Sequence, residues 1–204
     1  AALHDIGALS TKERLSTLDF EYATPHRHAD IGYLLLRNLD DLAREALIVK
    51  YHHVPWENGK GAAYKGLNVP LGSQILFAAD RAAVLIDPRR EILGQQQTIL
   101  SAMRKNQGSL FRPDVIDALI AAAQKEAFWL DIGFLSMEEI LDEGLGDQSL
   151  NLSLEGLLSL AGLFREIIDF RTDFTAAHST GVAVVAETLS SLSGFSRDDV
   201  RKMR

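Results

Sequence analysis

The stretch Ala2-Leu3-His4-Asp5-Ile6-Gly7 contains an adjacent histidine and aspartate, and this pair is the basis for predicting both fold and chemistry. Residues 1–6 are expected to be the end of a helix, because the following Gly7 is a typical helix stop. Imidazole and carboxylate groups together bind first-row divalent metals. An adjacent His-Asp pair can direct one ligand to each of two metals, with the carboxylate between them, and two close metals can clamp a phosphate and generate hydroxide for in-line attack.

Histidine is unevenly distributed along the chain. Five of the six histidines lie between residues 4 and 53, as His4, His26, His28, His52 and His53, and the sixth is His178. Asp80 ends the apolar stretch 75–79 and is expected to be buried, which is costly for a carboxylate unless it is paired or binds a metal. Taken singly, each histidine is explained as well by a packed or surface side chain, and Asp80 by a helix cap or an ion pair. The joint pattern favours a metal site.

The composition excludes several classes of protein. The 204 residues are 47% hydrophobic and 24% charged, which predicts one domain or one and a half with a buried core. The absence of cysteine excludes a disulfide scaffold and a thiolate metal site. A net charge of -7 argues against a DNA-binding surface. No apolar run is long enough for a membrane span or a signal peptide, so we expect a cytoplasmic protein without membrane contact.

The apolar residues follow a helical period, so the predicted class is all-α. Ser10 and Glu13 are spaced as a capping box. Helices are expected over residues 28–38, 42–49, 73–86, 89–106 and 113–130, the last beginning at Pro113, with a long ordered loop over 54–72. The expected organisation is a domain over residues 1–135, an acidic, glycine-containing linker over 136–152, and further helices over 153–204, the first capped by Ser153.

These motifs resemble the HD superfamily of metal-dependent phosphohydrolases, and in particular its HD-GYP domains. The resemblance spans residues 1–87 and is carried by linked stretches at residues 2–7, 28–32, 51–59 and 66–76, continuing to Asp80. It implies an all-helical HD bundle, here without its first helices, that binds two or more divalent ions such as iron, manganese, nickel or zinc. It also implies hydrolysis of cyclic di-GMP.

The resemblance also implies a role for particular residues. It makes metal ligands of His4, Asp5, His28, His52, His53 and Asp80, and Asp5 is in addition the predicted catalytic residue. The chain departs from the family pattern in having Ala8 where a substrate-binding lysine usually follows, Val54 in place of a glutamate, and Gly61-Ala62-Ala63-Tyr64 in place of Gly-Tyr-Pro. Lys60, Lys65 and Arg81 are candidate phosphate contacts by location. Trp56 and Tyr64 are candidates either to stack a base or to pin the loop to the core.

The C-terminal segment resembles the start of a second HD domain. Residues 173–183 look like the helix that supplies a first histidine ligand, here His178, and residues 195–204 look like the helix that follows it. The chain is therefore expected to be the middle of a tandem HD protein. Exchange of these C-terminal helices between identical chains would form a homo-oligomer in which His178 of one copy completes the His4-Asp5 site of another.

Two functions compete on this sequence. The first is a metal-dependent phosphohydrolase, an enzyme that hydrolyses a nucleotide or a cyclic dinucleotide such as cyclic di-GMP in bacterial signalling. The alternative is a catalytically degenerate HD module that binds a partner or senses a ligand, which the altered lysine and Gly-Tyr-Pro positions favour. A purely structural helical domain would leave the histidine pattern unexplained.

Overall fold

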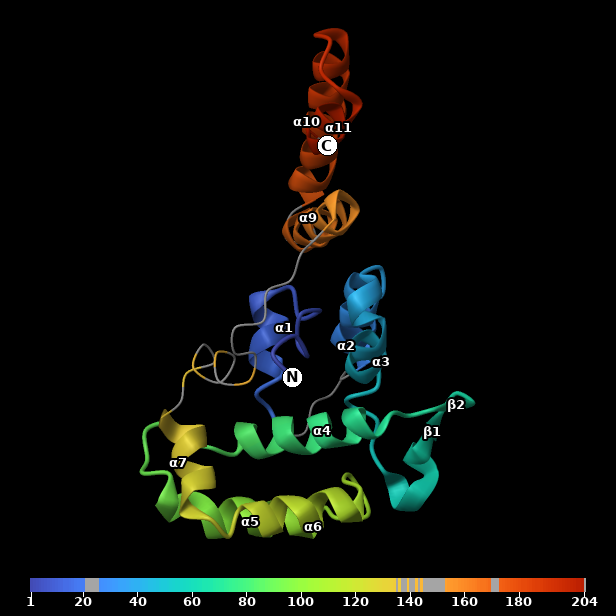
Figure 1. Ribbon diagram of the computed structural model, residues 1–204. Helices are drawn as coiled ribbons and strands as arrows, with labels where there is room; N and C mark the ends of the chain where they lie inside the picture. Colours follow the sequence, from blue (N-terminus) through green and yellow to red (C-terminus); the bar gives the residue numbers. More distant parts are fainter. Residues whose placement is uncertain are drawn as a thin grey trace. The chain divides into compact units, whose positions relative to one another are not determined.

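The computed structural model describes residues 1–20, 26–134, 136, 139, 142, 144, 153–169 and 173–203. The named elements of these residues are helices apart from one short hairpin (Figure 1). The α-helices are α1 (Thr11–Ser16), α2 (His26–Leu36), α3 (Ala43–Lys50), α4 (Leu71–Val84), α5 (Gln96–Lys105), α6 (Pro113–Ala122), α7 (Glu126–Phe134), α9 (Leu154–Asp169), α10 (Asp173–Leu192) and α11 (Arg197–Lys202). Short 3₁₀ helices are η1 (Asp40–Leu42), η2 (Glu57–Ala62) and η3 (Leu93–Gln95). The predicted all-α class is confirmed.

The chain forms two compact units. The first contains residues Ala1–Tyr33 and Arg44–Gln148, and the second contains Leu34–Ala43 and Ser149–Arg204. The linker predicted over residues 136–152 falls almost entirely outside the described residues. No helix in the described part of the chain has both the length and the apolar character needed to cross a membrane.

The N-terminal segment of the first unit folds as turns followed by α1. The backbone N–H groups of His4, Ile6 and Ala8 donate to the carbonyl oxygens three residues earlier, so residues 2–7 form successive turns and the predicted helix end is wrong. The capping box is confirmed. The backbone N–H of Glu13 donates to Ser10 Oγ (3.1 Å), and that of Ser10 donates to Glu13 Oε2 (3.3 Å).

Two glycines let this segment approach α2 and α3 closely. A Cβ atom on Gly7 would lie 2.0 Å from the carbonyl oxygen of His28, and one on Gly32 would lie 2.9 Å from Val49 Cγ1. Both distances are too short for any other residue without movement of the backbone or the neighbouring side chain. The glycines of the two motifs therefore bring the His-Asp pair against the helix that carries His28.

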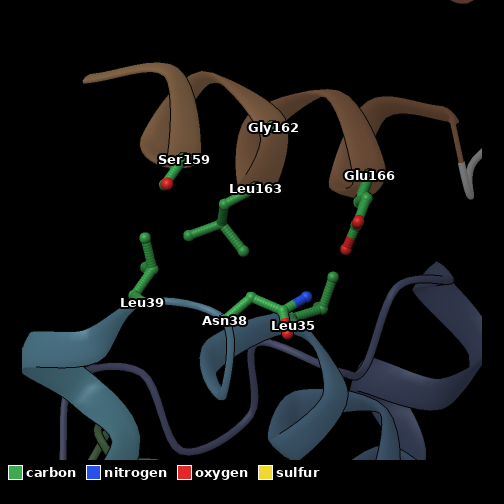
Figure 2. Close-up of a pocket in the computed structure, with 7 residues that line it drawn as sticks. All are labelled: Leu35, Asn38, Leu39, Ser159, Gly162, Leu163 and Glu166. Carbon is green, nitrogen blue, oxygen red and sulfur yellow. The ribbon is translucent and has the colours of Figure 1, made fainter. Parts of the chain in front are cut away.

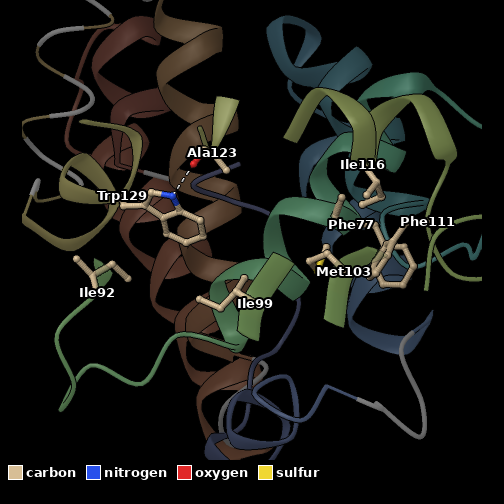
Figure 3. Close-up of a cluster of buried hydrophobic side chains, with 9 residues drawn as sticks. Phe77, Ile92, Ile99, Met103, Phe111, Ile116, Ala123 and Trp129 are labelled. Atoms are coloured by element: carbon tan, nitrogen blue, oxygen red, sulfur yellow. Dashed lines mark hydrogen bonds between the residues drawn. The ribbon is translucent and has the colours of Figure 1, made fainter. Parts of the chain in front are cut away.

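The core of the first unit lies between α4, α5, α6 and α7 (Figure 3). The inner face of α4 buries residues that recur at helical spacing, namely Ser73, Gln74, Phe77, Ala78 and Arg81. Phe77 packs on Phe111 of the α5–α6 connection, with ring centroids 5.3 Å apart. α4 contacts both α5 and α6, which pack on each other. This core supports the helix that carries Asp80.

Two helix boundaries differ from the sequence prediction. Instead of one helix over 113–130, α6 begins at Pro113 as expected but ends at Ala122, and α7 begins at Glu126. The indole N–H of Trp129 donates to the carbonyl oxygen of Ala123 (2.9 Å), which stabilises the turn between them (Figure 3). The helix predicted over 89–106 starts later, because η3 precedes α5.

The predicted loop over residues 54–72 contains regular structure that the sequence analysis missed. η2 is followed by strands β1 (Ala63–Tyr64) and β2 (Leu67–Asn68), which pair antiparallel. The turn residues Lys65 and Gly66 both have positive φ, 50° and 80°. Positive φ at both central residues is the mark of a tight two-residue hairpin turn. Strands of two residues are too short to show an alternating pattern.

The second unit is built on α9 and α10. The backbone N–H of Gly156 donates to Ser153 Oγ (3.1 Å), so the predicted cap of this helix is confirmed. α10 packs against α9 and α11. Leu163 of α9 is buried and points toward Leu35 and Leu39 of the same unit, beside a cavity of about 180 Å³ (Figure 2).

Candidate metal centre

The six predicted ligands lie together in the first unit. His4 and Asp5 come from the N-terminal turns, His28 from the first turn of α2, His52 and His53 from the turn after α3, and Asp80 from α4. Each has a ring nitrogen or carboxylate oxygen close to that of another member of the set. Four separate segments thus converge on one site.

Asp5 lies between two groups of ligand atoms. Its Oδ1 atom is 3.1 Å from His28 Nε2 and 3.7 Å from His52 Nε2. Its Oδ2 atom is 3.3 Å from His4 Nε2. The two oxygens of one carboxylate therefore face different histidines, which is the arrangement expected of a carboxylate between two metals.

The first group is buried. One ligand atom from each of Asp5, His28, His52 and His53 lies within 4.8 Å of the others. His28, His52 and His53 are 1%, 0% and 4% exposed. Asp5 Oδ1 is buried, and no group in the described residues meets the geometry of a hydrogen bond to it. Three imidazoles around one buried carboxylate oxygen are a donor set that suits a first-row divalent ion, so the residues present fit a metal.

The second group contains His4 and Asp80. His4 Nε2 lies 3.6 Å from Asp80 Oδ1, on the side of the site to which Asp5 Oδ2 points. The Asp80 side chain is only 9% exposed, as expected for an aspartate in an apolar stretch. This group supplies one imidazole and two carboxylates.

Backbone carbonyl groups orient two of the imidazoles. The Nδ1–H of His52 donates to the carbonyl oxygen of Val49 (2.5 Å), and that of His4 donates to the carbonyl oxygen of Ala1 (2.9 Å). Such bonds fix the orientation of each ring, so that its Nε2 atom faces the site. The ring of His53 also packs edge-on against Phe77, with centroids 5.6 Å apart. The cluster is therefore in contact with the hydrophobic core.

The ionisation of the cluster follows from burial and from its two carboxylates. Burial lowers the pKa of His52 and His53 below the usual value, which favours the neutral imidazole that a metal requires. Burial lowers the pKa of His4, but its contacts with the carboxylates of Asp5 and Asp80 outweigh this effect and raise the pKa to about 10. Burial opposes ionisation of Asp5, yet the nearby imidazoles of His28, His4 and His52 hold its pKa well below the usual range.

The three candidate phosphate contacts differ in exposure. Lys60 in η2 and Lys65 at the hairpin turn are exposed. Arg81 is 2% exposed, and its guanidinium donates to Asp80 and to backbone carbonyls. The substrate contact expected of Arg81 is therefore corrected, because a buried and fully engaged guanidinium has no donor left for a phosphate.

Two aromatic residues of the 54–72 segment are held by the protein itself. The Arg112 guanidinium lies 5.2 Å from the ring centroid of Trp56, whose backbone N–H donates to the carbonyl oxygen of Leu110 (2.9 Å). Tyr64 stacks on His26, with centroids 5.3 Å apart. Both contacts favour the interpretation that these rings pin the segment.

Two histidines lie outside the cluster. His26, beside the cluster on α2, packs on Tyr64, and burial lowers its pKa. His178 lies in α10 of the second unit and is exposed.

The groups that orient the ligands could not be predicted from the sequence. The Ala1 and Val49 carbonyl groups belong to no motif, since every residue has a carbonyl. The bonds from Arg81 to residues 17–20 link segments far apart in sequence, and no local pattern marks them.

The region that contains this site is similar to known proteins. The family model of the HD domain matches residues 1–85, which contain all six predicted ligands. The chain is 28% identical over 203 residues to 3'3'-cGAMP-specific phosphodiesterase 1 of Vibrio cholerae serotype O1, which covers 92% of this chain. The chain spans about half the length (46%) of that relative. No solved structure matches.

Proposed function

Since residues 1–85 are an HD domain, we propose that this chain is a metal-dependent phosphohydrolase that cleaves a cyclic dinucleotide. The position of Asp5 carries the proposal, with one carboxylate oxygen directed to His28 and His52 and the other to His4. A carboxylate placed in this way would offer one oxygen to each of two metals. The Vibrio cholerae relative acts, by its name, on 3'3'-cGAMP, which supports a cyclic dinucleotide as the substrate class.

In this proposal two sets of residues that share Asp5 would hold the metals. His28, His52 and His53 complete the first set, and His4 and Asp80 complete the second. Bound divalent ions would supply Lewis acidity to the phosphodiester and lower the pKa of water at the site. The protein contributes the orientation of the rings through Val49 and Ala1, and the dry surroundings of the buried histidines.

The substrate phosphate needs a cation from the protein. The position that carries a lysine in the HD-GYP pattern is Ala8 here, which is buried and has no charged group. This position therefore supplies no cation. We propose that Lys60 and Lys65, both exposed on the segment that follows His53, supply this charge. The same observation at Ala8 favours the alternative function, a domain that binds metal and ligand without turnover.

A direct assay separates the two functions. The chain is purified, loaded with Mn²⁺, and incubated with 3'3'-cGAMP and with cyclic di-GMP, and linear products are measured by chromatography. We expect cleavage of at least one of them by the wild type, and cleavage slower on the order of 1,000-fold by Asp5→Asn. Binding of either nucleotide without cleavage, under every metal tested, would support the non-catalytic module.

We also propose that the second unit mediates self-association and that His178 belongs to an HD-like segment there. Exposed apolar side chains of α10 support the self-association: Val182, Val185 and Leu189 are 54%, 57% and 59% exposed. Light scattering on the wild type and on Val185→Glu tests the association. A wild type that is monomeric at all concentrations would contradict it.

A further inference from the structure

Arg81 is a buried guanidinium that the proposed reaction does not use. It lies on the inner face of α4 directly after the ligand Asp80, and it is 2% exposed. A guanidinium has five N–H donors, and a buried one is costly unless these donors are satisfied.

All five donors of Arg81 have acceptors. The Nε and one Nη2 N–H donate to Asp80 Oδ2, at 3.1 and 2.7 Å. The second Nη2 N–H donates to the carbonyl oxygen of Thr17 (2.8 Å), and the Nη1 group donates to the carbonyl oxygens of Asp19 and Phe20. Arg81 thus joins the Asp80 carboxylate to the backbone at the end of α1.

The bonds from Arg81 to backbone carbonyl groups fix the position of its guanidinium. Thr17 is the C-cap residue of α1, and carbonyl groups at a helix end have no partner within the helix. An arginine that binds three carbonyl groups in one short segment is fixed in position, because its planar fork cannot rotate without losing several bonds at once.

The bonds from Arg81 to the Asp80 carboxylate determine which of its oxygens remains available to a metal. Both donors from Arg81 go to Oδ2, whereas Oδ1 lies 3.6 Å from His4 Nε2. One oxygen is therefore bound by the guanidinium, and the other points toward the second ligand group. The positive charge also offsets one of the two carboxylates of that group.

From this geometry we infer that Arg81 is a positioning residue for the metal centre, which holds Asp80 so that Oδ1 alone is offered as a ligand. The inference rests on the proposed two-metal function, since it assigns the second metal to His4, Asp80 and Asp5. It predicts that Arg81 acts on metal binding through Asp80 and through no other ligand.

The inference is tested by titrating the metal-free 204-residue chain with Mn²⁺ in a calorimeter. The proteins compared are the wild type, Arg81→Lys, Asp80→Asn and the double variant. Arg81→Lys keeps the charge but cannot make the five bonds. We expect it to weaken one of the metal equivalents by about 10- to 100-fold, the range typical of groups that orient a ligand. In the Asp80→Asn background the same substitution should have no further effect on metal affinity.

A matched control is Arg14→Lys. Arg14 Nε donates to the carbonyl oxygen of Ala8 (2.9 Å), so this variant loses an arginine–backbone bond in the same unit without touching Asp80. Its metal affinity should equal that of the wild type.

Several results would overturn the inference. One is an Arg81→Lys variant that binds Mn²⁺ as tightly as the wild type. Another is an equal loss of Mn²⁺ affinity when Arg81→Lys is made in the Asp80→Asn background. Either result would show that Arg81 does not act through Asp80. Arg81→Gln is the second variant, and failure of both variants to fold would show that the guanidinium supports the fold instead. A wild type that binds no metal would instead remove the proposed function itself.

Discussion

His28 Nε2 lies 3.1 Å from Asp5 Oδ1, so the histidine of α2 meets the aspartate of the N-terminal turns inside the first unit. The other oxygen of the same carboxylate faces His4 at 3.3 Å. Asp5 is thus the residue through which the two groups of ligands are connected, and the predictions below depend on this connection.

Replacement of Asp5 should affect both groups of ligands. Asp5→Asn keeps the size of the side chain but removes the charge that His28, His52 and His4 face. Metals supply several kcal/mol of transition-state stabilisation, so we expect hydrolysis to fall on the order of 1,000-fold. Initial rates at saturating Mn²⁺ measure this, with Asp30→Asn, an exposed aspartate of α2, as the control. Equal rates for Asp5→Asn and the wild type would exclude Asp5 from the site.

Metal binding should stabilise the fold. The buried ligand cluster exists only in the folded chain, so a bound ion adds its binding free energy to the free energy of unfolding. At a metal concentration about 100 times Kd this is about 2.7 kcal/mol. For a chain of this length the midpoint of thermal unfolding should rise by about 5–10 °C. Scanning calorimetry with Mn²⁺ and with EDTA measures the difference, and an unchanged midpoint would argue against metal binding in this cluster.

The glycine of the His-Asp-Ile-Gly motif should be essential for packing. In Gly7→Ala the new Cβ would lie 2.0 Å from the carbonyl oxygen of His28, which is backbone and cannot move aside freely. We expect a loss of about 3 kcal/mol in the free energy of unfolding. The control is Gly162→Ala in α9, where no atom lies within 4 Å of the added Cβ and a gain of about 0.5–1 kcal/mol is expected. Denaturant titration compares them, and equal stabilities would contradict the close approach.

Much of the fold could be predicted from local sequence patterns. The capping box of α1, Pro113 at the start of α6 and the ligand-bearing segments follow from residue types at short spacing. The break between α6 and α7 could not be predicted, because it depends on a hydrogen bond from Trp129 that forms only in the packed core. The hairpin at Lys65 was missed because its strands have two residues each.

The candidate ligands could be proposed from the sequence for a different reason. His4, His28, His53 and Asp80 stand in motifs whose order resembles a known family, although the spacing alone does not bring them together. Location in sequence made Arg81 a candidate phosphate contact, but the fold buries its side chain. Burial of an arginine depends on the segment packed over it, here residues 17–20.

Exposed lysines should contribute to substrate affinity. The double variant Lys60→Ala/Lys65→Ala removes two charges from the segment after His53 and leaves every metal ligand in place. We expect KM to rise about 10-fold with kcat nearly unchanged, since a hydrogen bond to a charged group contributes about 1.5–3 kcal/mol. Lys125→Ala, an exposed lysine between α6 and α7, is the matched control. An unchanged KM in the double variant would exclude these lysines.

The metal content of the purified chain tests the central claim most directly. The chain is stripped with chelator, reconstituted in turn with manganese, iron, nickel and zinc, and desalted, and bound metal is counted by mass spectrometry. The shared carboxylate of Asp5 predicts about two equivalents per wild-type chain and fewer in Asp5→Asn. A wild-type chain that retains none of the four metals would contradict the account.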